Sequence, residues 1–270
     1  MSTAIEDRVS LERTAAPLGG FNLTFLGIEL RRKLRNRRSI AFTVVFPVLM
    51  YYLAGYPNHD VALTEVPLAQ GGLSVAAYIM VSMALYGAMM SATNAGGAVA
   101  TERALGWSRQ LRLTPLNPMA NVAMKLIAGM MFGLIAVVAT YLAGVISGVH
   151  MSAAQWIFSG LAAWLLGSAV FTTLGLLFGY LVPGENAMQV TSLVVVFFSF
   201  IGGLFYPVSM MPPIMQDVAA WTPVYGIGEI ARAPLTGQGF DALVLVNAVC
   251  WFAIFAVGTA LLFRRDTKRV

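Results

Sequence analysis

The sequence predicts an all-α membrane protein in which six transmembrane helices account for most of the chain. Of its 270 residues, 58% are hydrophobic and 11% are charged, and the mean hydropathy is +0.75. A soluble domain carries roughly 25% charged residues, so a soluble protein of this composition would have too few charges to cover its surface. Long apolar runs recur along the chain, and basic residues gather beside them. We therefore expect lipid to surround most of it.

Six apolar stretches reach the length of about 17 residues that a bilayer crossing requires. They are residues 40–56, 73–100, 122–149, 156–182, 188–207 and 242–263. The first is short and contains Pro47, whereas the second to fourth are long enough to tilt or protrude. We expect a single membrane domain over residues 39–265. A flexible cytoplasmic N-terminus (1–20), an interfacial helix (21–38) and a cytoplasmic tail (266–270) complete the division.

The segment before the first span is expected to lie as a helix on the inner face of the membrane. Leucines form a stripe at helical spacing and arginines lie away from it. These residues are Leu23, Leu26, Leu30 and Leu34, with Arg31, Arg35 and Arg38. Two interpretations stay open at equal weight: a basic anchor that fixes orientation, or a helix with a specific mechanical role.

The distribution of basic residues predicts the orientation, because Lys and Arg stay preferentially on the cytoplasmic side. With the N-terminus inside, sixteen of the 17 basic residues are cytoplasmic and only Arg232 lies outside. We therefore expect a bacterial inner-membrane protein with both termini in the cytoplasm. The net charge of +5 then points to anionic lipid headgroups, and not to nucleic acid, as the counterpart.

The chain shows no arrangement typical of an enzyme. A phosphate-binding GxxxxGK[ST] loop needs a Gly-Lys step, and none of the three lysines follows a glycine. His59 and His150 fall in outer loops without metal-ligand partners at suitable spacing. We expect no cofactor or metal bound by this chain.

The spans are also expected to lack buried charge. Lys125 lies near the inner end of the third span, and no Asp or Glu occupies the middle of any span. Ion-coupled transporters usually need such groups as relays. Any transport should therefore be driven from elsewhere, and the cargo should be apolar or amphipathic.

Two segments have sequence patterns that say more about function than the composition does. In the loop after the second span, Thr101 is expected to cap a short exposed helix with an acid in its first turn, which Pro115 would end. After the fifth span, Gly202 and Gly203 permit a sharp turn. Residues 210–235 follow and are expected to form short, proline-broken helices at the outer membrane surface, where Trp and Tyr are favoured.

Both segments, in this order and in a six-span frame, resemble the membrane subunit of type-2 ABC exporters, with the daunorubicin-resistance type of drug-export permease as the nearest subgroup. The first matches an E-R-x-x-G-x-x-x-x-L-x-x-x-P pattern, and the second a pattern of Phe, Pro, Met-Pro, Trp-x-x-Pro and Arg. The matching residues are Glu102, Arg103, Gly106, Leu111 and Pro115, then Phe205, Pro207, Met211, Pro212, Trp221, Pro223 and Arg232. Tyr206 separates Phe205 from Pro207, which departs from the pattern.

The resemblance implies a set of roles and partners. Residues 101–110 would form a coupling helix docked into a separate ATPase subunit, with residues 21–38 as a connecting helix. Two ATPase copies would carry ATP and Mg, and a second permease, identical or related, would complete the pathway. The coupling residues would be Glu102, Arg103, Gly106, Trp107 and Arg109, and the outer gate Phe205, Pro207, Met211, Pro212 and Trp221.

Met83, Met89 and Asn94 in the second span could offer an adaptable cargo surface, although core packing is the favoured explanation for the methionines. Steps such as Gly175-x-x-x-Gly179 are assigned to helix packing. The leading hypothesis is the permease half of an ATP-driven exporter. A membrane-embedded lipid-modifying enzyme and a structural or sensory membrane protein are the alternatives, and the former would need a carboxylate or histidine cluster at the inner interface.

Overall fold

The structure is a computed structural model that describes residues 23–63, 73–105, 118–182, 184, 186–208, 211–237, 239 and 241–267. Within these ranges the chain is helical, and its only extended pairing is an isolated antiparallel bridge between Ala62 and Ser74. The predicted all-α fold class is confirmed.

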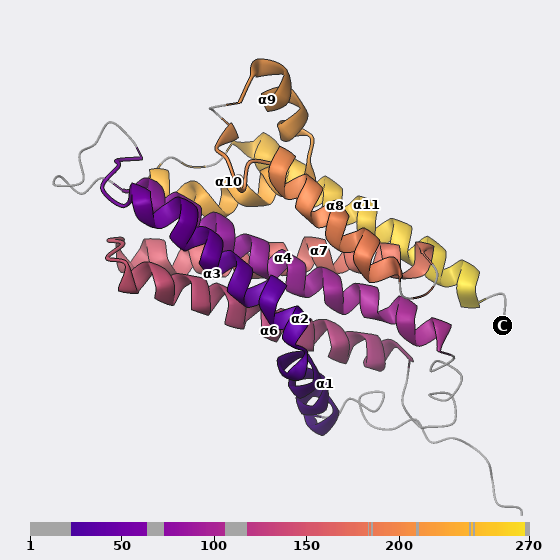
Figure 1. Cartoon of the computed structure of the whole chain (residues 1–270). Helices are drawn as coiled ribbons and strands as arrows, with labels where there is room; N and C mark the ends of the chain where they lie inside the picture. Colours follow the sequence, from indigo (N-terminus) through magenta and orange to yellow (C-terminus); the bar gives the residue numbers. More distant parts are fainter. Residues whose placement is uncertain are drawn as a thin grey trace, which may run out of the picture.

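The main helices follow one another along the chain (Figure 1). They are α1 (Leu23–Arg35), α2 (Arg37–Ile40), α3 (Phe46–Met50), α4 (Val75–Ala104), α6 (Pro118–Ile146), α7 (Ala153–Leu181), α8 (Asn186–Ile201), α9 (Pro213–Ala220), α10 (Pro223–Thr236) and α11 (Ala242–Thr267). We name the ends of the bundle after α4: the Ala104 end is predicted to be cytoplasmic and the Val75 end to be outside.

Five helical stretches in the described residues are long and apolar enough to cross a membrane: Arg37–Asn58, Val75–Ala104, Val122–Ile146, Ala153–Leu181 and Ala242–Arg265. The remaining predicted span corresponds to α8, which has only 16 residues. At 1.5 Å per residue it is about 24 Å long, less than the hydrocarbon thickness of about 30 Å. It ends early because the chain turns at Gly203, whose φ is 79°.

The first span is an unbroken helical path despite Pro47. Two π-helical turns, Ala41–Val45 and Tyr51–Gly55, flank α3. Such turns shift the backbone hydrogen-bond pattern locally, so the helix continues past the hydrogen bond that the proline cannot make. Gly87 of α4 lets this path approach closely, since a Cβ there would lie 2.9 Å from the Thr43 carbonyl oxygen.

The core of the bundle is α4, which packs against α6, α7, α8, α10 and the first span. Its span window is 83% buried, against 17% for that of α11. Glycines bring α4 and α7 together: a Cβ on Gly96 would lie 2.5 Å from the Leu176 nitrogen, and one on Gly179 would lie 2.9 Å from the Gly96 oxygen. The packing role predicted for Gly175 and Gly179 is confirmed.

A hairpin, residues 202–237, follows α8 and contains the two short helices α9 and α10. We call the segment that leads from α8 to α9 its first arm and α10 its second arm. In Figure 1, α9 projects from the bundle while α10 lies against it. Thr222 caps α10 through a hydrogen bond from the Tyr225 nitrogen (3.3 Å), and Gly237 ends it at φ 65°. The short helices are therefore confirmed, while a place at the membrane surface stays a prediction, also for α10. Its buried face packs on α7 and α11.

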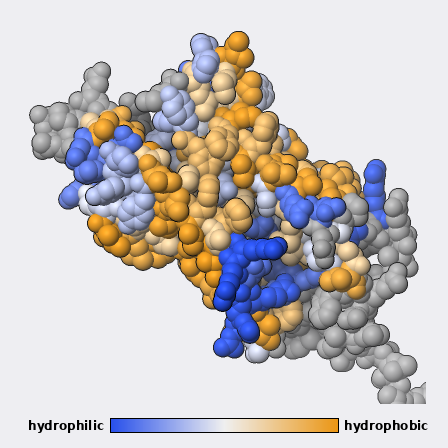
Figure 2. Space-filling model, viewed as in Figure 1, coloured by the Kyte–Doolittle hydropathy of each residue, from blue (hydrophilic) through white to orange (hydrophobic). Residues whose placement is uncertain are grey.

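The surface is consistent with a lipid environment. Figure 2 shows hydrophobic residues over the middle of the visible face and a hydrophilic patch where α1 and α2 lie. Large apolar side chains on α8 and α11 are exposed, among them Leu193 at 69% and Leu243 at 71%. Soluble monomeric proteins rarely expose large contiguous apolar faces, and such faces mark contact with a membrane or with another protein.

Candidate functional site

A buried lysine marks the most highly charged part of the interior. Lys125 lies near the start of α6, and its side chain is 3% exposed. Its Nζ donates to Glu29 Oε1 at 2.9 Å and to Glu102 Oε1 at 2.5 Å. Arg32 Nη2 lies 2.9 Å from Glu29 Oε2 and 3.8 Å from Glu102 Oε1. These four residues, two cations and two carboxylates, form what we call the ion cluster.

The ion cluster joins three helices at the Ala104 end. Glu29 and Arg32 stand one turn apart on α1, Glu102 belongs to the last turn of α4, and Lys125 belongs to α6. A buried lysine is tolerated only when opposite charges compensate the loss of water. The cluster therefore fixes α1 against the two helices that flank residues 106–117, which lie outside the described residues.

The expectation that the spans lack buried charge is wrong for Lys125. Glu29 is the only acidic residue between positions 21 and 38, and it is turned into the bundle, 4% exposed. The leucine stripe divides accordingly. Leu26 and Leu30 are half-buried, whereas Leu23 and Leu34 are exposed. Arg31 and Arg35 are exposed, as expected of residues away from the packed face.

The start of the predicted coupling helix differs from expectation. Thr101 does not cap a new helix, because α4 continues without interruption to Ala104. Glu102 and Arg103 consequently lie in the last turn of α4 and are half-buried instead of exposed on a loop. Arg103 Nη1 donates to the Gly179 oxygen at 3.2 Å, and its guanidinium lies 4.9 Å from the Tyr180 ring centroid. Gly106, Trp107 and Arg109 lie outside the described residues.

Burial also changes the pKa of a second lysine, Lys33, which lies on α1. Lys33 lies one turn beyond Glu29, and loss of water around its amine lowers its pKa from 10.5 to about 8. The neighbouring Arg32 and Lys125 lower it further, while the carboxylate of Glu29 opposes them. The amine of Lys33 is thus neutral at a lower pH than that of an ordinary lysine.

The residues predicted for the outer gate lie along the hairpin between the end of α8 and the start of α10. Phe205 packs its ring against Phe200 (4.6 Å between centroids), Tyr86 (5.5 Å) and Phe46 (6.3 Å). Of the others, Met211 is buried, Pro207 is half-buried, and Pro212 and Trp221 are exposed. The structure thus holds Phe205 against α4, while Trp221 stands 80% exposed at the end of α9.

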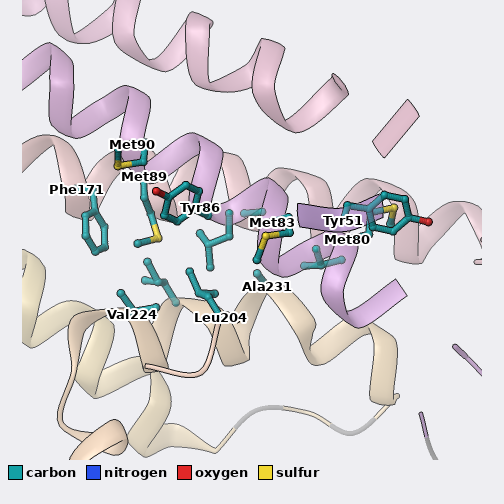
Figure 3. Close-up of a cluster of buried hydrophobic side chains, with 14 of the residues drawn as sticks. Tyr51, Met80, Met83, Tyr86, Met89, Met90, Phe171, Leu204, Val224 and Ala231 are labelled. Atoms are coloured by element: carbon teal, nitrogen blue, oxygen red, sulfur yellow. The ribbon is translucent and has the colours of Figure 1, made fainter. Parts of the chain in front are cut away.

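The residues suggested as a cargo surface do not line an open space in this conformation. Met83 and Met89 are 1% and 0% exposed and belong to the packed core. Figure 3 shows them on α4, facing Leu204, Val224 and Ala231 of the hairpin. The third residue, Asn94, is half-buried, and its side-chain oxygen accepts from Ser192 Oγ at 3.4 Å. A cargo role for these residues stays a prediction.

A buried arginine near the Val75 end received no role from the sequence. Arg232 on α10 is 2% exposed; its Nη1 donates to Ser82 Oγ at 3.1 Å and its Nη2 pairs with Glu229 Oε1 at 2.8 Å. Its guanidinium lies 4.6 Å from the Tyr78 ring centroid. Two indications were available: Arg232 is the single basic residue outside the cytoplasmic segments, and it is the arginine that ends the pattern after the fifth span. Over the described ranges, no three His, Cys, Asp or Glu side chains are placed to hold a metal ion.

Comparison with known proteins gives two likenesses. The family described as "ABC-2 type transporter" matches residues 23–235. "Putative transport permease YvfS" of Bacillus subtilis (strain 168) is 29% identical over 204 residues, which cover 74% of this chain and 80% of that protein. The family match runs from the first residue of α1 into α10, so it includes the ion cluster and both arms of the hairpin.

Proposed function

This chain belongs to the ABC-2 type transporter family, and on that premise we propose that it is the permease of an exporter driven by a separate ATPase subunit. The family assignment makes it a multi-pass membrane subunit of an ABC transporter. The direction of transport, the cargo and the composition of the complex belong to the proposal.

The observation that carries the proposal is the ion cluster. A partner that binds the segment between α4 and α6 acts on the last turn of α4, where Glu102 lies. Through Lys125 that force reaches α6, and through Arg32 and Glu29 it reaches α1. Paired charges in a site with little water resist separation, so the three helices should move together. This arrangement suits a junction that transmits the motion of an ATPase.

The cluster changes the roles that we assign to the coupling residues. Glu102 and Arg103 bind within the chain and would hold the base of the loop in position. Direct contact with the ATPase then falls to Gly106, Trp107 and Arg109, together with Leu105, which is 72% exposed. The ATPase, present in two copies, would bind ATP and Mg, and a second permease would complete the pathway.

An apolar or amphipathic cargo is supported by the positions of the buried charges. Lys125 lies in the second turn of α6 and Arg232 in the hairpin, and each is paired within the chain. In the described part of the spans, no Asp or Glu lies midway to serve as an ion relay. Energy must then come from ATP in a partner, and selection of the cargo must come mainly from shape and apolar contact.

The test is purification of the tagged chain from its native membranes. We expect an ATPase with a phosphate-binding loop to co-purify and the complex to hydrolyse ATP, while the chain separated from it does not. Lys125→Met should lower the fraction of the ATPase retained or raise the ATP consumed per cargo moved. Asp60→Ala, at an exposed position near the Val75 end, serves as the control. Hydrolysis by the chain freed of every partner would refute the proposal.

A further inference from the structure

The buried Arg232 binds the core helix α4 through neutral groups. Its two contacts there are the hydroxyl of Ser82, at 3.1 Å, and the ring of Tyr78, at 4.6 Å. Both α4 residues lie within the first two turns at the Val75 end. A charged group this deeply buried in a membrane protein is expensive unless it is paired, and such a residue usually has a functional reason.

The counter-charge of Arg232 stands on its own helix. Glu229, three residues earlier on α10, pairs with it at 2.8 Å and has a side chain that is 38% exposed. Gly228 provides the space for this arrangement, because a Cβ there would lie 2.9 Å from the Nη2 nitrogen. The cation and its carboxylate therefore form an ion pair within α10, and this pair does not depend on the contacts that α10 makes with other helices.

This arrangement is the opposite of that in the ion cluster. There Lys125 on α6 reaches carboxylates on α1 and α4, so separating those helices would break buried ion pairs. Moving α10 away from α4 would break one hydrogen bond to a neutral hydroxyl, one ring contact and the apolar packing of side chains such as Val224 and Ala231, but no ion pair between the two helices. The charges would stay together, and the larger penalty of an uncompensated buried ion would not arise.

The same part of α4 also holds the other arm of the hairpin. The Tyr78 hydroxyl donates to the Gly203 oxygen at 3.5 Å, in the turn that ends α8. Leu204, the next residue, is 1% exposed, and Phe205 packs on Tyr86 of α4 at 5.5 Å. Figure 3 shows Leu204 and Ala231, one from each arm, facing the same side of α4. All of these contacts are apolar or involve a neutral group of α4.

We propose that Arg232 is a positioning residue that latches the hairpin of residues 202–237 onto α4, and that the hairpin opens by releasing Ser82 and Tyr78 while the Arg232–Glu229 pair stays intact on α10. The inference rests on the proposed function in one respect, since it takes the hairpin as the gate of the cargo pathway. The bundle then combines a fixed junction at its Ala104 end with a releasable contact at its Val75 end.

The test substitutes Ser82 in two opposite directions. Leu204→Cys in a Cys250→Ala background reports opening through its reaction with a water-soluble maleimide, measured on the purified chain without any ATPase. Ser82→Ala removes the acceptor of a charged donor, and should speed labelling by roughly tenfold to a hundredfold where opening limits the reaction. Ser82→Asp places a carboxylate on α4 opposite Arg232 and should slow labelling below the parent rate, because the latch then spans two helices as an ion pair.

A matched control is available on the same helix. Ser91 is also a buried serine of α4 and donates to the Gly129 oxygen of α6 at 2.6 Å, so Ser91→Ala should leave the rate of labelling at position 204 unchanged. If Ser82→Asp does not fold, Tyr78→Leu, which removes the ring below Arg232, should speed labelling more than Tyr78→Phe, which keeps it.

Two patterns of results would overturn the latch. Acceleration by both Ser82 substitutions would mean that the site is only a packing position, since any disturbance would then loosen it. Equal rates in the parent, the Ser82 variants and Ser91→Ala would mean that this contact does not hold the hairpin. Because no ATPase is present, neither pattern depends on whether the chain is a permease, which the co-purification experiment decides separately.

Discussion

Replacing Lys125 with methionine is the most direct perturbation of the ion cluster. Methionine has a similar length and fits an apolar site, so the change removes the charge with little loss of packing. Glu29 and Glu102, with side chains 5% and 16% exposed, would then face each other with Arg32 as their remaining cation in the cluster. Removing one partner of a buried pair costs about 3–5 kcal/mol. Since Arg32 stays 2.9 Å from Glu29, we expect the lower end, about 3 kcal/mol.

The assay is the free energy of unfolding of the purified chain in mixed micelles, and the design includes two comparisons. Glu102→Gln leaves Lys125 paired with Glu29 and should cost only about 1 kcal/mol. The triple variant Lys125→Met, Glu29→Gln, Glu102→Gln removes all the deeply buried charge of the cluster. It should be more stable than Lys125→Met alone, since replacing a whole buried ionic group by neutral residues is often close to neutral. A Lys125→Met loss below about 1 kcal/mol, or a triple variant worse than the single, would refute this reasoning.

Three further predictions concern other parts of the chain. Gly175→Val should destabilise the bundle by about 1–3 kcal/mol, because its Cβ would meet the Thr93 backbone. Gly239→Val should not, because a Cβ there has nothing within 4 Å. Equal unfolding free energies for the two variants would contradict the close α4–α7 contact. Acylation of Lys33 should rise with pH around a midpoint of about 8, since only the neutral amine reacts and burial lowers its pKa; Lys33→Arg should abolish this component, and a midpoint near 10.5 would count against the packing of α1. In intact cells a cysteine in place of His59 should react with an impermeant thiol reagent while one in place of Leu105 should not, and the reverse pattern would invert the predicted orientation.

Features set by local sequence could be predicted well. A run of apolar residues from 75 to 100 is too long to be anything but a bilayer-length helix, and α4 is that helix. Pro213 and Pro223 stand in the first turns of α9 and α10, where a proline is tolerated, so short helices in the hairpin followed from the proline spacing. The turn at Gly203 followed from the glycine pair.

Contacts between distant segments could not be predicted in the same way. Glu29 and Lys125 are 96 positions apart, and no periodicity links an acid on an interfacial helix to a lysine near the start of another helix. Without knowledge of that pairing, we expected Glu102 to be an exposed loop residue and used Lys125 only as a sign of the orientation. Arg232 was expected on a short helix at the outer membrane surface, and only the structure shows that it is buried, with Glu229 and Ser82 as its partners.

We propose that the segment following α4 receives an ATPase and that the ion cluster holds that segment in place. A photo-crosslinking amino acid at position 105, where Leu105 is 72% exposed at the end of α4, tests it in intact cells. We predict that irradiation joins the chain to a protein that mass spectrometry identifies as an ATP-binding-cassette ATPase, and that Lys125→Met reduces the yield. The same group at position 59, near the Val75 end, should capture no ATPase. Equal capture from both positions, or no ATPase captured from position 105, would show that the segment following α4 is not the ATPase contact.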